Sequence, residues 1–223
     1  MASSSNAAPA KSNISKRRKA ALSDGGAEYK AKRSELIRVA AVLFKEKGYK
    51  ATTLNDIAQL AGLDRATVYY YVGSKEEFLR EAIKGVVTRN LAEVDLILGM
   101  EDLDPRAKIQ RLIERLMISY DESYPYAHVY LQEEMHQVAD KRTAWAQDMV
   151  RSTRRFEKAV IDLIKKGIDD GIFREDVSVV LAANAIFGMV NWTHRWYKPG
   201  GKQSAKEVAD TFIKIFFDGM EKR

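Results

Sequence analysis

The stretch LDRATVYYYVGSK, residues 63–75, brings together side chains that can donate hydrogen bonds to a polar or anionic partner. Arg65 carries a planar, permanently charged guanidinium that can donate two bonds at once, and Lys75 carries a compact positive charge. Thr67 and the tyrosines at 69–71 add hydroxyl groups. Consecutive tyrosines on a helix point in directions about 100° apart, so all three cannot enter one core.

The residues around Arg65 have the pattern of two short helices joined by a tight turn. A helix-turn-helix needs a small residue where the helices cross, a glycine in the turn, and apolar residues that lock each helix. Ala58, Gly62, Leu63 and Val68 fill these positions. Any two helices around a glycine match part of this pattern, but the combined match favours a DNA-binding helix-turn-helix.

The longer stretch ATTLNDIAQLAGLDRATVYYYVGSKEEFL resembles the DNA-binding domain of the tetracycline-repressor (TetR) family. The resemblance runs through residues 34–80 and includes an opening helix that ends in FKEKGYKATT and the pattern Y-x-Y-V-x-S-K-E-E-F-L. It implies an all-α homodimer, a palindromic operator and an effector pocket in a variable C-terminal domain. The implied function is ligand-responsive regulation of transcription, commonly repression.

Several positions of this stretch have a physical reason to contact DNA. Arg65 lies in the first turn of the recognition helix, where arginine suits guanine O6 and N7. Ala66 allows close approach to a thymine methyl, and Thr67 can bond a base, a phosphate or its own helix. Thr53 caps the preceding helix and Asn55 lies in its first turn, where a helix N-terminus favours a phosphate.

The resemblance assigns the remaining contacts. It implies that Lys75 contacts a phosphate, which would explain a lysine at a helix N-terminus, an unfavourable place for a lone cation. It also implies that Tyr69 and Tyr71 face DNA while Tyr70 packs against neighbouring helices. Helical spacing alone instead places Tyr70 opposite the buried face, so the two arguments agree on Tyr69 and disagree on Tyr70.

The net charge is concentrated near the N-terminus. Residues 1–33 hold eight basic and two acidic residues, which accounts for the whole formal charge of +6. Residues 1–30 are rich in Ser, Ala and Gly and are predicted to form a flexible basic arm. Such an arm can enter a minor groove or follow phosphates, with Arg17 and Arg18 as candidate contacts. A solubilising tail is the alternative.

Helical periodicity extends through the chain from residue 30, without an alternating strand pattern. The sequence predicts an all-α fold, with a three-helix DNA-binding domain over residues 31–85 and a helical bundle for ligand binding and dimerisation over residues 86–223. A capping box of Ser74 and Glu77 opens a helix predicted over 74–85. The predicted bundle helices cover about 86–98, 104–122, 125–139, 142–170 and 176–197, with a last helix from Ser204.

Segment 176–197 is apolar nearly all round, which indicates burial on more than one side. One face would pack in the core of its own chain. The other would meet a partner subunit, because TetR relatives form a four-helix dimer interface from their last long helices. The alternative is a central helix in a monomeric bundle.

Methionine and aromatic residues of the C-terminal domain are candidates for an effector pocket, because they adapt to flat or long apolar ligands. Each could instead simply fill the core. Segment NWTHRWYKPGGKQSAKEVAD resembles TetR relatives that respond to acyl-CoA thioesters, which implies a small apolar or acyl-CoA effector. Arg154, Arg155 and Lys158 could meet a CoA phosphate or form a solvated face. The predicted ligand-binding residues are Met117, Tyr120, Tyr124, Tyr130, Met149, Phe156, Phe187 and Trp192.

Other classes of protein find little support in the sequence. The absence of cysteine excludes disulfides and thiolate metal sites, and no nucleotide-binding or serine-hydrolase motif supports an enzyme. Glu133 and His136 match half of a di-iron pattern that needs a second Glu-x-x-His pair, so no metal or cofactor is expected. No apolar run reaches ~18 residues, so a cytoplasmic protein without membrane contact is expected. A non-specific or architectural nucleic-acid binder is the alternative function.

Overall fold

The computed structural model describes residues 18, 20, 21, 23, 26–137 and 144–221. The regular structure in these residues is helical, apart from an isolated antiparallel bridge between Phe173 and Glu221. The predicted all-α class is therefore confirmed. The chain divides after Glu81 into two compact units.

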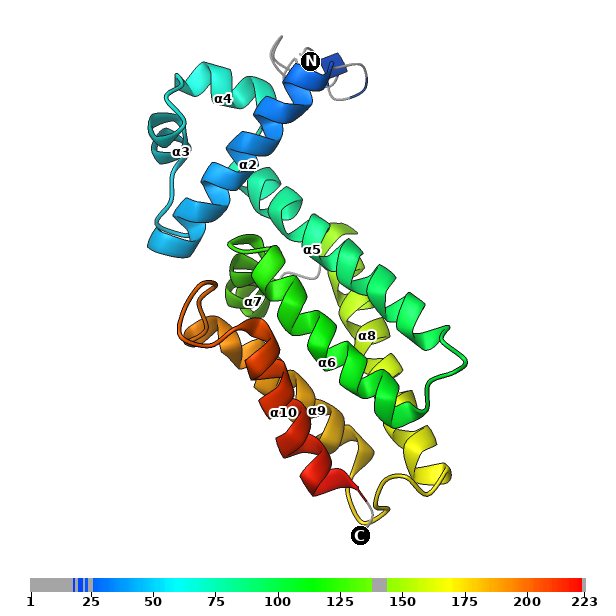
Figure 1. The fold of residues 1–223 in the computed structure, drawn as a ribbon. Coiled ribbons are helices and arrows are strands. Elements are labelled where there is room, and N and C mark those ends of the chain that lie inside the picture. Colours follow the sequence, from blue (N-terminus) through cyan, green and yellow to red (C-terminus); the bar gives the residue numbers. More distant parts are fainter. Residues whose placement is uncertain (1–17, 19, 22, 24–25, 138–143, 222–223) are drawn as a thin grey trace, which may run out of the picture. The chain divides into compact units, whose positions relative to one another are not determined.

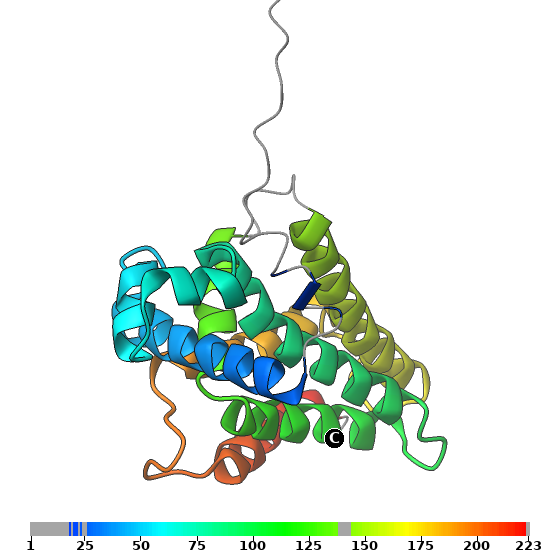
Figure 2. The ribbon, with the colours of Figure 1, turned by 90° about the horizontal axis from the view of Figure 1, so that it is seen from above.

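The first unit contains α2 (Ala27–Lys47), α3 (Leu54–Leu60), α4 (Arg65–Tyr71) and the beginning of α5 (Lys75–Leu98) (Figure 1). Helix α2 packs against α3 and α4, which also pack against each other, as the view in Figure 2 shows. Their shared core is apolar and fully buried. Its largest side chains are Leu36, Phe44, Ile57, Phe78 and Leu79.

Side-chain caps define where α3 and α4 begin. Thr53 accepts the Asp56 N–H, and the Asp56 carboxylate accepts the Thr53 N–H at 2.8 Å, which completes a capping box. Asp64 caps α4 by accepting the Thr67 N–H at 2.9 Å. These caps satisfy backbone donors that have no partner within the helix.

The turn between α3 and α4 requires glycine. Gly62 has φ of 65°, in the left-handed region that side chains with a Cβ rarely adopt. The following Leu63 N–H bonds to the Ala58 carbonyl at 2.9 Å and closes α3. The predicted positions of the small residue and the glycine therefore match the geometry of the turn.

The second unit is a bundle of the remaining helices. Helix α6 packs alongside α10 and α8, and α8 packs against α9 (Figure 1). The buried centre includes Ile109, Ile113, Met117 and Ile164. The elements after α5 are α6 (Pro105–Glu122), α7 (Tyr126–Gln137), α8 (Ala144–Asp169), α9 (Val179–Trp192), the short 3-10 helix η1 (Thr193–Arg195) and α10 (Ala205–Met220).

Two predicted boundaries differ from the structure. Helix α5 continues through Gly85, so the prediction of separate helices over 74–85 and 86–98 was wrong. A glycine within a helix costs about 1 kcal/mol, and the buried neighbours Ile83 and Val86 offset that cost. Helix α2 begins at Ala27, inside the segment predicted as a flexible arm. Among the helices of the described residues, none is long and apolar enough to cross a lipid bilayer.

Candidate DNA-binding surface and effector cavity

The first turn of α4 exposes Arg65 and Ala66. The Arg65 Nη2 donates to the Tyr69 hydroxyl at 3.2 Å, and the guanidinium lies 5.5 Å from the centre of the Tyr69 ring. This contact uses one of the five N–H donors of the exposed guanidinium. Asn55 is also exposed, in the first turn of α3. The helix-turn-helix thus presents an oriented arginine where base-edge contacts are expected.

The two threonines predicted to contact DNA also bond to cap carboxylates. Thr67 Oγ1 donates to Asp64 at 2.6 Å, and Thr53 Oγ1 donates to Asp56 at 2.6 Å. The Thr67 hydroxyl is the main cause of the lowered pKa of the Asp64 carboxyl, and the Thr53 hydroxyl is the main cause of the lowered pKa of the Asp56 carboxyl. Each threonine can still accept a hydrogen bond, but donation to a phosphate would compete with its cap.

The sequence did not lead us to predict Asp64 as the N-cap of α4. Its position directly before α4 and three residues before Thr67 is the usual arrangement of an N-cap, and that spacing could have identified it.

The resemblance implies that Lys75 contacts a phosphate, but in the structure Lys75 bonds to backbone carbonyls of the protein. Its Nζ donates to the carbonyls of Tyr49 at 2.9 Å, Lys50 at 3.2 Å and Thr52 at 3.0 Å. It also lies 4.5 Å from the centre of the Tyr49 ring. An ammonium has three N–H donors, so all are used within the protein. In this structure Lys75 holds the turn between α2 and α3 against the start of α5.

Tyr29 of α2 packs against the end of α4. Its ring stacks on Tyr71 with centroids 4.9 Å apart and meets Tyr70 edge-on at 5.5 Å. Its hydroxyl donates to the Tyr70 carbonyl at 3.4 Å. Tyr70 therefore packs as the resemblance implied, but Tyr71 shares that packing. Tyr29 lies within the segment predicted as a flexible arm, and the sequence predicted no role for it.

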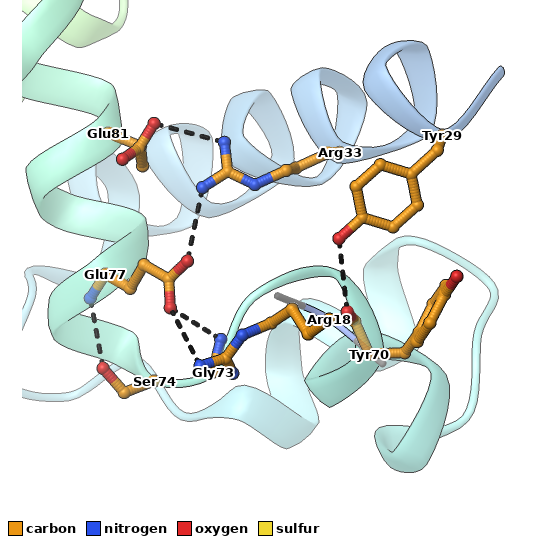
Figure 3. Close-up of polar contacts among 8 residues, drawn as sticks. All are labelled: Arg18, Tyr29, Arg33, Tyr70, Gly73, Ser74, Glu77 and Glu81. Carbon is orange, nitrogen blue, oxygen red and sulfur yellow. Dashed lines mark hydrogen bonds and ion pairs between the residues drawn. The ribbon is translucent and has the colours of Figure 1, made fainter. Parts of the chain in front are cut away.

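An ion-pair network joins α2 to the turn after α4 (Figure 3). Glu77 accepts the Gly73 N–H at 2.9 Å and pairs with Arg33 at 3.3 Å and with Arg18 at 3.8 Å. Arg33 also pairs with Glu81 at 3.1 Å. Arg18 thus contacts the protein in this structure, and Arg17, the other arm residue predicted to bind DNA, lies outside the described residues.

The second unit contains a cavity of about 180 Å³. Residues from α5, α6, α7, α8 and α9 line it. A cavity of ~150 Å³ lined by apolar residues holds benzene, so this one can enclose a small ring or a short acyl chain. The lining residues are Val86, Val87, Asn90, Leu91, Leu116, Ser119, Tyr120, Ala127, Tyr130, Leu131, Ser152, Thr153, Phe156, Glu157, Asn184, Phe187, Val190 and Asn191.

The polar groups of the cavity are almost all uncharged. Ser119 Oγ donates to Asn90 Oδ1 at 2.5 Å, which leaves the Asn90 amide N–H groups as donors. Burial raises the pKa of the Tyr120 hydroxyl, which lies 3.1 Å from His128 Nδ1. Glu157 supplies a carboxylate, and no lysine or arginine lines the cavity in the described part of the chain.

Two family models match the chain. Residues 36–82 match the family described as bacterial regulatory proteins, tetR family, and residues 102–220 match the tetracyclin repressor-like C-terminal domain. The chain belongs to the TetR family. The resemblance drawn from residues 34–80 is confirmed, and with it a non-enzymatic, DNA-binding regulator of transcription.

Named TetR relatives support the same assignment over nearly the whole chain. The transcriptional repressor KstR2 of Rhodococcus jostii is 31% identical over 85% of this chain and 91% of its own. The solved structure of the ketosteroid transcriptional regulator KstR2 of Mycobacterium tuberculosis has a TM-score of 0.79 and 29% identity, covering 86% of this chain and 95% of that one. The TetR regulator PfmR of Thermus thermophilus has a TM-score of 0.72 and 32% identity, covering 84% and 99%.

The eight predicted ligand-binding residues fall into two groups in this TetR-family chain. Tyr120, Tyr130, Phe156 and Phe187 line the cavity. The other four do not. Met117 is fully buried in the core, Met149 is buried outside the cavity lining, Tyr124 packs against the Tyr120 ring, and Trp192 is 59% exposed.

The small polar residues of the cavity were not among the predicted ligand-binding residues, which are methionines and large aromatics. Asn184, Phe187 and Asn191 all line the cavity from α9. Their spacing of three and four residues places them on one face of the helix. Two asparagines within an otherwise apolar helix face were therefore a signal for the site.

The basic residues suggested for CoA phosphates lie on the opposite side of α8 from the cavity. Helical spacing of about 100° per residue separates Arg154, Arg155 and Lys158 from the lining positions on that helix. Arg155 pairs with Asp95, and Lys158 pairs with Asp162, both at 2.5 Å. This group is a solvated face rather than part of the cavity.

Helices α9 and α10 carry large apolar side chains that the single chain leaves exposed. Leu181 is 68% exposed, Val180 53%, Trp192 59% and Ile215 60%. Several exposed apolar residues on neighbouring helices are characteristic of an interaction surface. This surface coincides with the segment predicted to meet a partner subunit, and we call it the α9–α10 face.

Proposed function

We propose that this TetR-family chain is a ligand-responsive repressor. It binds a palindromic operator as a homodimer and leaves it when an apolar or acyl-CoA effector occupies the cavity. The observation that carries the proposal is a ligand-sized cavity in the second unit, in a chain whose first unit has the exposed, oriented Arg65 of a DNA-reading helix.

The DNA-reading part of the proposal assigns base contacts to Arg65 and Tyr69. Arg65 would donate to guanine, and the Tyr69 ring would keep its guanidinium in place. Asn55, Ala66 and Tyr71 would complete the protein surface along the groove.

The effector part of the proposal follows from a cavity lining that is mostly neutral and contains no lysine or arginine among the described residues. An apolar ring or acyl body would fill the space, and the Asn90 amide would donate to an uncharged oxygen such as a ketone or thioester carbonyl. Burying a phosphate or a carboxylate without a cation is costly. The phosphates of a CoA thioester would therefore stay outside the cavity. The ketosteroid regulator among the relatives supports an apolar effector with a carbonyl group.

Effector binding would act through α5. Val86 and Asn90 line the cavity, and the same uninterrupted helix begins at Lys75 beside the α2–α3 turn. A ligand that displaces α5 at Asn90 would also displace its first turn, and this would change the position of the reading helix.

Dimerisation would use the α9–α10 face. A two-fold symmetric dimer would pair this face with its own copy and bury Leu181 and Trp192. The palindromic operator follows from that symmetry, because each protomer would read one half-site.

The experiment that tests the proposal begins with selection of binding duplexes from a random-sequence DNA pool. We expect a palindromic consensus that the protein prefers over random DNA by about 10³-fold or more. A panel of CoA thioesters, and the ketones, alcohols and free acids with the same carbon skeletons, is then added to the complex. Release of the duplex by one neutral compound or thioester, but not by the matching free acid, supports the proposal.

The alternative function is non-specific nucleic-acid binding driven by the basic N-terminal segment. It predicts no consensus, a strong dependence on salt and a specificity ratio near one. That result would overturn the repressor proposal.

A further inference from the structure

Helix α2 begins before the residues that the N-terminal TetR-family model matches. Helix α2 begins at Ala27, whereas the family match begins at residue 36. Residues 27–35 therefore add roughly two and a half turns to the helix. Tyr29 and Arg33 lie on one face of this extension, because they are four residues apart.

Tyr29 holds the C-terminal end of the reading helix. The last carbonyls of a helix have no partner within it, and in the seven-residue α4 this leaves the Tyr70 carbonyl free to accept the Tyr29 hydroxyl. The Tyr29 ring adds a stacked contact with Tyr71 and an edge contact with Tyr70. The end of α4 thus contacts the extension through two ring–ring contacts and one hydrogen bond.

Arg33 holds the turn that follows the reading helix (Figure 3). It bridges Glu77 and Glu81, while Glu77 also accepts the Gly73 N–H. The side chains of Arg33 and Glu77 are 14% and 15% exposed. Removing Arg33 would take the nearer of two positive partners from the largely buried Glu77 carboxylate, which is unfavourable. The network therefore fixes the turn that leads from α4 to α5.

We propose that Tyr29 and Arg33 are positioning residues for sequence-specific DNA recognition. The extension sets the orientation of α4 on α2 and α5 and thereby aims Arg65 at the base edges. Base contacts need a defined helix orientation, whereas phosphate contacts carry no sequence information. Loss of the extension contacts should therefore reduce specificity more than affinity for DNA in general.

The test compares the full-length wild type with Tyr29→Ala, Tyr29→Phe and Glu28→Ala, the last changing an exposed residue of the same turn. The probes are the duplex selected by the wild type and random DNA of equal length. We expect Tyr29→Ala to raise the dissociation constant of the selected duplex about tenfold, on the scale of one aromatic pair. Binding to random DNA should change less than about twofold. Tyr29→Phe keeps the stacking and should stay near the wild type, as should Glu28→Ala.

Repeating the DNA selection with Tyr29→Ala gives a readout that a purely structural role would not change. A relaxed consensus supports the proposal. An unchanged consensus with an unchanged specificity ratio overturns it, and so does a parallel loss of specific and random binding, which would mean that Tyr29 only stabilises the fold.

Arg33→Gln provides a second variant if Tyr29→Ala reduces helicity in circular dichroism. We expect it too to lower the ratio of selected to random binding, and an unchanged ratio would overturn the proposal. A different result would refute the proposed repressor function: the wild type itself would then select no consensus sequence.

Discussion

The two compact units use their polar side chains in different ways. In the first unit three polar side chains near the reading helix bond to the protein itself: Lys75 to three carbonyls, Arg33 to two carboxylates, and Asp64 to Thr67. In the second unit Asn90 and other neutral polar groups line a cavity. The difference indicates that the DNA-reading unit is preorganised and exposes few functional side chains, whereas the effector unit keeps space for a ligand.

The largest effect is expected at the α9–α10 face, where the proposed homodimer would form. Leu181→Glu would place a charge in the proposed interface twice, once from each protomer. Each substituted site should weaken the dimer by about 2 kcal/mol. We therefore expect the dissociation constant of the dimer to rise on the order of 10³-fold, as measured by analytical ultracentrifugation. Leu96→Glu is the matched control, because Leu96 is 63% exposed on α5, outside this face. Equal effects of the two substitutions would contradict the proposed interface.

Arg65→Ala tests whether the first unit reads DNA through its few exposed side chains. A guanine contact is worth about 1–3 kcal/mol, so affinity for the selected duplex should fall roughly ten- to a hundredfold. Affinity for random DNA should change little, as measured by fluorescence anisotropy. Arg38→Ala removes the same charge from an exposed position of α2 and should leave the ratio of selected to random binding unchanged. A consensus as sharp as that of the wild type would refute the role of Arg65.

Asn90→Ala tests the cavity without changing the DNA-reading residues. The loss of one hydrogen bond to a neutral ligand oxygen should raise the effector concentration needed for release by about tenfold. Affinity for DNA without effector should remain close to that of the wild type. Arg154→Ala on the opposite side of α8 should not affect release. If Arg154→Ala and Asn90→Ala shift release equally, the effector does not bind as proposed.

Substitution of Lys75 distinguishes its bonds within the protein from the phosphate contact that the family resemblance implies. Hydrogen bonds that involve a charged group contribute about 1.5–3 kcal/mol, so Lys75→Ala should lower the free energy of unfolding by a similar amount. The salt dependence of DNA binding should keep its slope. A slope that flattens by about one, with stability unchanged, would instead assign Lys75 to a phosphate.

The smallest expected effect concerns the cap of the reading helix. The pKa of Asp64 lies below its ordinary value of 3.8, mainly because Thr67 bonds to the carboxylate. A lowered folded-state pKa contributes stability above pH 3.8, and this stability is lost as the pH falls through the folded-state pKa. Asp64→Asn should therefore weaken the pH dependence of unfolding in this acidic range. If the variant has the same acid unfolding curve as the wild type, Asp64 does not contribute to the pH dependence of stability.

The sequence predicted the elements that follow directly from local chemistry. The glycine turn at Gly62, the cap at Thr53 and the apolar lock at Val68 are local features, and all are present. Gly85 misled the helix prediction because burial of its neighbours depends on contacts between distant segments. Tyr29 and Asn90 were missed for the same reason, since their partners Tyr71 and Ser119 are distant in sequence.

Native mass spectrometry of the protein with its selected duplex tests the central claim most directly. The account predicts complexes with an even number of protomers on the duplex, and loss of the duplex when one apolar compound or CoA thioester binds. A monomer on the duplex would contradict the account, and so would a bound compound that leaves the protein–DNA complex intact.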